Sequence, residues 1–209
     1  MTAAPIRFHK NPNGVRLPPI PRALVNEANA LYDSLNQLGR QLGEQLTLVY
    51  AYLDKFGPYV STFASCSKGC SHCCSMDVQL TTLEAEYIQV HTGVPLRAAG
   101  RLTTGHRSPC PFLTDAGACG IYRFRPLVCR IFHALGDPEN CRPGREQIQY
   151  GAPPQYGNDI FLNLLGWVNH VTIHADGTCR DIRDFFPPPP GAGSIVLVPS
   201  GQSGINLAS

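Results

Sequence analysis

The 209 residues include 17 Lys and Arg, 15 Asp and Glu and 9 Cys, which gives a formal net charge of +2. A charge this close to zero argues against a dominant electrostatic attraction to nucleic acid or to an anionic membrane. The first residues lack the apolar core of a signal peptide, and no segment approaches the roughly 20 apolar residues of a spanning helix, so we expect a cytoplasmic protein.

The N-terminal part of the chain predicts a leader followed by a helix. Residues 1–20 are rich in Pro, Gly and Asn, which predicts an irregular leader. Pro21 suits the first turn of a helix. Apolar residues then recur in alternating three- and four-residue steps until the pattern is interrupted at Gly57. We therefore predict a long amphipathic helix over residues 21–57.

The apolar stripe of this helix allows two interpretations. In the first, the helix packs against its own domain, with a bend near Gly39 and Gly43. In the second, residues 21–56 form the seam of a homodimer. The stripe is short and few charged residues flank it, which favours packing within the chain.

Residues 58–186 hold the nine cysteines and several short predicted elements. The stretch MDVQL predicts a short strand. Thr81, with Glu84 three residues later, forms a capping box before a helix that ends at Gly93. Two short apolar runs on either side of residues 115–117 predict a small β-hairpin, and RPLVCRIF predicts one or two helical turns.

The C-terminal part predicts one more helix and a tail. Asn158 is placed to cap the apolar helix DIFLNLLGWVNHV, with Trp167 in the core. A turn at Asp176 and Gly177 follows, and the Pro- and Gly-rich residues 187–209 predict a tail that starts stiffly. The expected fold class is mainly α, small and loop-rich, with a long N-terminal helix, a cysteine-cluster metal-binding core and a short β-hairpin.

Four thiols crowd into the nine residues CSKGCSHCC: Cys66, Cys70, Cys73 and Cys74. Thiolates this close repel one another, and a metal offsets their charge and drives their deprotonation. Cys70-x2-Cys73 has the spacing of a zinc knuckle, and Cys66-x3-Cys70-x2-Cys73 has that of an iron–sulfur loop. Neighbouring side chains seldom point at one centre, so we expect Cys73 and Cys74 to serve two centres or to leave one thiol without a metal.

The remaining cysteines arrive singly along the chain. In the cytoplasm such a pattern indicates metal or catalysis rather than disulfides. A single cysteine is most often a buried apolar residue, but four of them between residues 110 and 141 favour a shared role. Together with the first four they make eight cysteines, the number that two four-sulfur sites require. The predicted metal ligands are Cys66, Cys70, Cys73, Cys74, Cys110, Cys119, Cys129 and Cys141, and Cys179 is the predicted bystander.

The cysteine-rich segments resemble a known family. CSKGCSHCC, CPFL, CGIYRFRPLVCRIF and NCRPGR are similar to the pattern of the YkgJ-type cysteine-cluster family of zinc- or iron-chelating proteins, over residues 66–141. The resemblance implies metal binding. A related group that shares the cluster, the flagellin lysine-N-methylases, implies an enzymatic option, and whether the chain is an enzyme stays open. Besides the eight cysteines, the matching positions are Ile121, Tyr122, Arg125, Pro126, Arg130 and Phe132.

An iron–sulfur cluster of the 4Fe-4S type is the favoured cofactor, and zinc is the alternative. Zinc sites usually gather two close pairs of ligands, whereas here one loop supplies three or four cysteines and the others arrive singly, as in iron–sulfur ligation. Arg125 and Arg130 are candidate cofactor-binding residues because their charge would offset that of a thiolate-bound cluster. The alternative for both is a salt bridge or a hydrogen bond to a loop carbonyl.

The spacing of the first three cysteines also fits the radical-SAM signature. The chain after them lacks the alternating strands and helices of a barrel, so we do not favour this interpretation.

Histidines offer further candidate ligands. His72 lies inside the thiol-rich loop, where solvent exposure is the simpler expectation, and His133 is a weaker candidate. His174 with Asp176 and Asp181 would make a small polar site, although a turn explains the same residues.

Three functions fit these observations. The first is an iron–sulfur protein that carries out a redox or group-transfer reaction on a peptide, a protein or a small molecule. The second is a zinc-stabilised protein-interaction module that presents the 21–56 helix. The third is a metal storage or delivery protein.

Overall fold

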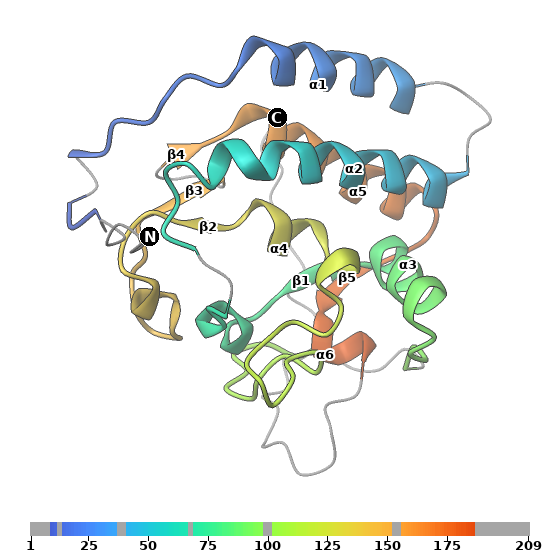
Figure 1. The fold of residues 1–209 in the computed structure, drawn as a ribbon. Coiled ribbons are helices and arrows are strands. Elements are labelled where there is room, and N and C mark those ends of the chain that lie inside the picture. Colours follow the sequence, from blue (N-terminus) through green and yellow to red (C-terminus); the bar gives the residue numbers. More distant parts are fainter. Residues whose placement is uncertain are drawn as a thin grey trace.

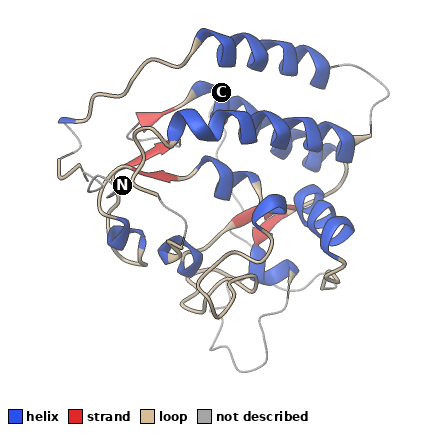
Figure 2. Ribbon diagram, in the orientation of Figure 1, coloured by secondary structure: helices blue, strands red, loops and turns tan. Residues whose placement is uncertain are grey.

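The computed structural model describes residues 9–11, 14–36, 41–66, 69–97, 102–151 and 156–186. Helices predominate in these ranges and the strands are short (Figure 1, Figure 2), so the mainly α, loop-rich class is confirmed. The α-helices are α1 (Arg22–Leu35), α2 (Leu42–Val60), α3 (Thr82–Thr92), α4 (Leu127–Ile131), α5 (Asp159–His174) and α6 (Ile182–Phe185). The strands are β1 (Gln79–Thr81), β2 (His133–Ala134), β3 (Gln149–Gly151), β4 (Tyr156–Gly157) and β5 (Cys179–Asp181).

The prediction of one long N-terminal helix is wrong. The helix ends at Leu35, and Gln41 has an extended backbone (φ −69°, ψ 139°) before a second helix begins at Leu42. Helices α1 and α2 then lie side by side and run in opposite directions (Figure 1). The end predicted at Gly57 is also wrong, because α2 continues to Val60 with Pro58 inside its last turn. The predicted bend at residue 39 lies outside the described residues.

The apolar stripe of the predicted helix is buried in the core of its own chain, as the first interpretation expected. Helices α1, α2, α4 and α5 enclose this core, in which the Phe56 ring lies 4.9 Å from that of Phe161. Trp167 packs at its edge and is only partly buried. The homodimer stays a prediction. The stripe contributes Ala28, Leu31, Leu35, Leu46, Val49 and Leu53, all buried.

Two small sheets join distant parts of the chain. Strand β1 pairs antiparallel with β5, with Leu80 opposite Arg180. Strand β3 pairs antiparallel with β2 and parallel with β4. The predicted small hairpin is a single antiparallel bridge between Leu113 and Cys119. These pairings bring the last described segment of the chain beside the cysteine-rich loops.

The caps at the ends of α3 and α5 were predicted correctly. The Thr81 hydroxyl accepts a hydrogen bond from the Glu84 amide at 3.3 Å, and the Glu84 carboxylate accepts one from the Thr81 amide at 2.9 Å, which completes the capping box. Gly93 ends α3 in the left-handed conformation. The Asn158 side chain accepts from the first amides of α5. Such motifs act within a few residues, so they can be found without knowing the tertiary structure.

A second, smaller core lies beneath the cysteine-rich loops. It is built from β1, α3 and α6, and includes Leu80, Ile88, Ile182 and Phe186. The side chains of Cys110, Cys119 and Cys129 pack against it. Within the described ranges, the helices are too short or too polar to cross a membrane.

Candidate metal centre

Cysteines from separate stretches of the chain are carried to one side of the second core. Cys73 and Cys74 lie on the short 3₁₀ helix His72–Ser75, which contacts the 3₁₀ helix Pro138–Cys141. Cys119 lies at the antiparallel bridge and Cys129 lies in α4. All nine cysteines are free thiols in the structure. These thiols are therefore available as metal ligands.

Cys73 lies at the centre of this gathering. Its thiol interacts electrostatically with those of Cys66, Cys119, Cys129 and Cys141, although these residues are far apart in the sequence. The thiols of Cys70 and Cys110 join the group through interactions with Cys66, Cys141, Cys119 and Cys129. We call these seven residues and Cys74 the cysteine cluster.

The neighbouring thiols of Cys73 and Cys74 contact each other directly. From the sequence, we expected them to point to two centres or to leave one thiol without a metal. Their hydrogen bond, together with burial, raises the pKa of Cys73. The Cys74 carbonyl accepts a hydrogen bond from the Cys110 amide at 2.7 Å, which ties the thiol-rich loop to the next cysteine segment. Which of the two thiols binds metal stays a prediction.

Cys179 stands apart from the cluster. It lies on β5 with an exposed side chain, and the charged group that influences it is Glu84 rather than any other thiol. Its predicted role as a bystander agrees with this placement.

Burial raises the pKa of several cluster thiols. It raises the pKa of Cys110 and of Cys141 to about 11, and raises that of Cys129 well above its usual range. Thiolates, not thiols, are the ligands of zinc and of iron–sulfur clusters, so a bound cation must supply the energy of deprotonation.

Two hydrogen bonds to sulfur fix the edges of the cluster. The Ala134 amide donates to Cys66 Sγ at 3.2 Å, and the Gln147 side-chain amide donates to Cys141 Sγ at 3.2 Å. Donors of this kind orient a ligating sulfur and tune the metal that it binds.

Arg125 faces the cluster. Its positive charge lowers the pKa values of Cys66, Cys73, Cys119 and Cys129 against the larger effect of burial. The guanidinium lies over the Tyr122 ring, 4.2 Å from its centroid. Its Nε is buried and has no hydrogen-bond partner among the described residues. A buried donor without an acceptor is uncommon, and this one belongs to the guanidinium whose charge acts on four of the thiols.

Arg130 is occupied elsewhere. Its guanidinium forms an ion pair with Asp54 at 2.6 Å, lies 4.2 Å from the centroid of the Tyr50 ring, and donates to the carbonyls of Arg123 and Arg125. A salt bridge or a hydrogen bond to a loop carbonyl was the alternative to cofactor binding for Arg130, and these contacts are of that kind. The contacts of Arg130 tie the loop that carries Arg125 to helix α2.

A buried polar network beside the cluster could not be found from the sequence. One ligand atom each from Asp77, His106 and Asp181 lie within 4.8 Å of one another, a spacing that a metal could bridge. No three cysteine sulfurs in the described part of the chain meet this distance. The partners are 29 and 104 positions from Asp77 in the sequence, and no local motif links them.

The oxygens of this network are already used. Asp77 accepts hydrogen bonds from Thr104 Oγ1, from the amides of Gly105 and His106, and from His106 Nδ1 at 2.8 Å. These bonds outweigh the effect of burial and lower the pKa of Asp77 to about 2. Asp181 also accepts four hydrogen bonds, from Val78 and from Arg183. Because a carboxylate offers about four lone-pair sites, the network is saturated without a metal.

Arg183 connects this network to the cluster. Its side chain is completely buried, pairs with Asp181 at 3.0 Å, and donates to the carbonyls of Ser108, Met76 and Cys74. Asp181 and Arg183 are two residues apart in the sequence, but the other partners of Arg183 come from two distant segments, one with Ser108 and one with Cys74 and Met76. Arg183 therefore positions the backbone on both sides of the cysteine pair.

The histidines named in the sequence analysis lie at the edge of the cluster or away from it. His72 pairs with Glu139 at 2.8 Å. Burial, with a smaller effect of the Arg125 charge, lowers the pKa of His133 to about 4. His174 is exposed, whereas Asp181 is buried in the saturated network, so the structure does not assemble the polar site that was considered for them.

The comparisons with known proteins agree with the chemistry of this site. Eight clustered thiols with a cationic side chain facing them are the donor set of a thiolate metal-binding domain. Residues 65–156 match the family model CxxCxxCC, described as "Putative zinc- or iron-chelating domain". The match is to the YkgJ-type cysteine-cluster family, which the motifs in this segment of the chain indicated. No curated protein and no solved structure matches the chain.

Proposed function

We propose that the cysteine cluster holds an iron–sulfur cluster, of the 4Fe-4S type, that serves a redox or group-transfer reaction on a peptide, a protein or a small molecule. The observation that carries this proposal is the convergence of thiols on Cys73. One loop contributes several cysteines, and the others come singly from distant segments. Iron–sulfur proteins commonly distribute their ligands in this way, whereas structural zinc sites usually use two close pairs.

The residues present fit such a group. Thiolates are the ligands that iron–sulfur clusters require, and a bound cluster would supply one-electron chemistry or a site for a substrate on iron. The unpartnered Nε of Arg125 supports the assignment further. A donor and a positive charge beside the thiolates stabilise their negative charge and raise the reduction potential.

The cluster contains more thiols than a single four-sulfur centre uses. Eight thiols allow two such centres, or one centre with spare thiols beside it. The contact between Cys73 and Cys74 places one candidate for a spare thiol directly against a central ligand. A zinc-stabilised interaction module and a metal storage protein are the competing functions. The first requires a redox-inert metal, and the second requires a metal that is easily exchanged.

Anaerobic purification followed by iron, sulfide and zinc analysis tests the proposal. We expect a brown protein with iron and acid-labile sulfide in similar amounts. Cys70→Ser should lose most of the metal and destabilise the fold, while the matched variant Cys179→Ser should retain both. A colourless protein with stoichiometric zinc overturns the iron–sulfur assignment. Full metal content in Cys70→Ser overturns the placement of the centre.

A further inference from the structure

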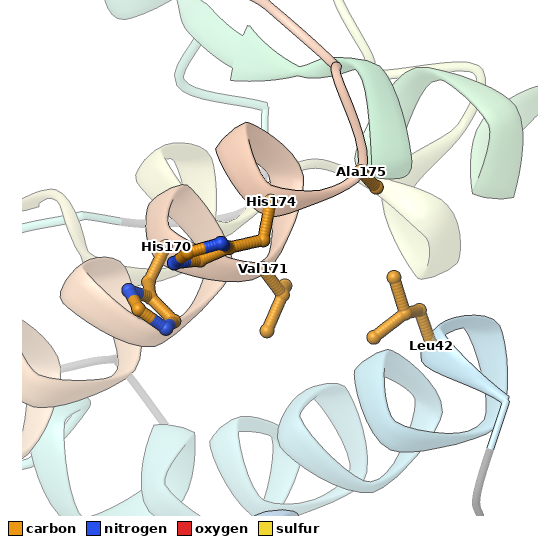
Figure 3. A pocket seen from close by; sticks show the side chains of 5 residues that line it. All are labelled: Leu42, His170, Val171, His174 and Ala175. Atoms are coloured by element: carbon orange, nitrogen blue, oxygen red, sulfur yellow. The ribbon is translucent and has the colours of Figure 1, made fainter.

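The last turns of α5 carry a pocket that is separate from the cysteine cluster. It has a volume of about 250 Å³ and lies between the C-terminal end of α5 and the first residue of α2 (Figure 3). His170 and His174 line it together with Leu42, Val171 and Ala175, and no cysteine does. The polar groups of this pocket are therefore imidazoles, whereas those of the cluster are thiols.

The two histidines form a pair on one face of the helix. They are four residues apart, which places their side chains on adjacent turns of the same face. The ring centroids lie 4.3 Å apart and the rings are inclined at 63°. The two rings lie beside each other (Figure 3), both line the pocket, and both residues are exposed. Neither ring has a hydrogen-bond partner in the described part of the chain.

We infer that His170 and His174 bind one divalent transition-metal ion of the zinc or nickel class at the surface. Two histidines at this helical spacing can bind one metal ion through their ring nitrogens, as they do in the HExxH zinc motif. Imidazole nitrogen is a preferred ligand for zinc, nickel and copper and a poor one for magnesium or calcium. Water completes the coordination, because the pocket is open to solvent.

The position of the pair at the end of the helix favours a cation. The carbonyl end of a helix carries partial negative charge, and the pair lies in the last two turns of α5. The apolar side chains of Leu42 and Val171 form the rest of the pocket wall and bring no competing cation. This site goes beyond the proposed function and does not depend on it, since it uses no residue of the cluster.

Titration of the metal-loaded protein, as purified and freed of excess metal, with Ni²⁺ in a calorimeter tests the inference. We expect one additional Ni²⁺ per chain. Its absorption should lack the thiolate-to-nickel charge-transfer band in the near ultraviolet. His170→Gln and His174→Gln should each weaken binding by at least the roughly 10- to 100-fold that loss of a supporting partner costs at a metal site. Both residues are exposed, so the variants should stay folded.

His91→Gln is the matched control. His91 is also an exposed helical histidine, but its Nδ1 lies 2.8 Å from the Tyr87 carbonyl and it has no histidine neighbour in the described residues. This variant should bind Ni²⁺ like the original protein. Binding that survives both substitutions in the pair, or that shows a thiolate band, overturns the inference. The absence of any additional bound Ni²⁺ does the same, whatever the cysteine cluster contains.

Discussion

Replacing Arg183 with Met removes the guanidinium while keeping a long apolar side chain. Asp181, which is completely buried, then loses its cationic partner at 3.0 Å. Breaking a buried ion pair by removing one partner costs about 3–5 kcal/mol. The carbonyls of Ser108, Met76 and Cys74 also lose donors, at about 1–3 kcal/mol for each one left unpaired. These costs overlap because they belong to one network.

We therefore expect Arg183→Met to lower the free energy of unfolding by about 4 kcal/mol or more, a large share of the roughly 5–15 kcal/mol that stabilises a typical domain. Urea unfolding of the metal-loaded protein, followed by circular dichroism, measures the change. Arg107→Met is the control, since Arg107 is exposed and adjoins Ser108 in the sequence. Its free energy of unfolding should stay within about 0.5 kcal/mol of that of the original protein. A loss below about 1 kcal/mol for Arg183→Met would show that the network does not hold the cluster loops.

Three further predictions concern other parts of the molecule. Arg125→Met removes the charge that faces the thiols, so the bound metal should be lost to a competing chelator sooner than from the original protein. The depressed pKa of His133, about 4 when folded against 6.5 when unfolded, means that stability is fully present above pH 6.5 and is lost as the pH falls toward 4. The free energy of unfolding of His133→Gln should therefore change less across that pH window than that of the original protein, by at most about 3 kcal/mol. An unchanged pH dependence contradicts the burial of this ring. A Cβ on Gly151, at φ 125°, would lie 1.9 Å from the Ile131 carbonyl oxygen, so Gly151→Ala should cost about 3 kcal/mol or more, whereas Gly166→Ala, in open space on α5, should gain up to about 1 kcal/mol. Thermal unfolding of the pair checks this contrast.

Elements defined by nearby residues could be predicted from the sequence, while those defined by distant contacts could not. The capping box at Thr81 and the cap at Asn158 act within three residues, and both were found. The helix over residues 21–57 was mistaken for one element because its apolar steps continue in phase across the break between Leu35 and Leu42. A periodic pattern shows which face is buried, but it does not show that the chain reverses direction.

The same distinction between nearby residues and distant contacts applies to the candidate site. The spacing of the cysteines pointed to a shared centre and to Cys179 as the exception, because the chemistry of thiolates constrains which of them belong together. The role of Arg183 could not be seen, since its partners include carbonyl groups 75 and 109 positions away. Arg125 and Arg130 looked equivalent in the sequence, and only their surroundings separate the one that faces the thiols from the one that binds Asp54.

X-ray absorption at the edge of the bound metal identifies the atoms that surround the ion without assuming which metal it is, so it shows whether the cysteine cluster holds that metal. We predict a coordination shell made of sulfur at about 2.3 Å, which disappears together with the metal in Cys70→Ser. A shell dominated by nitrogen and oxygen at about 2.0–2.1 Å, such as Asp77 and His106 would provide, would contradict it.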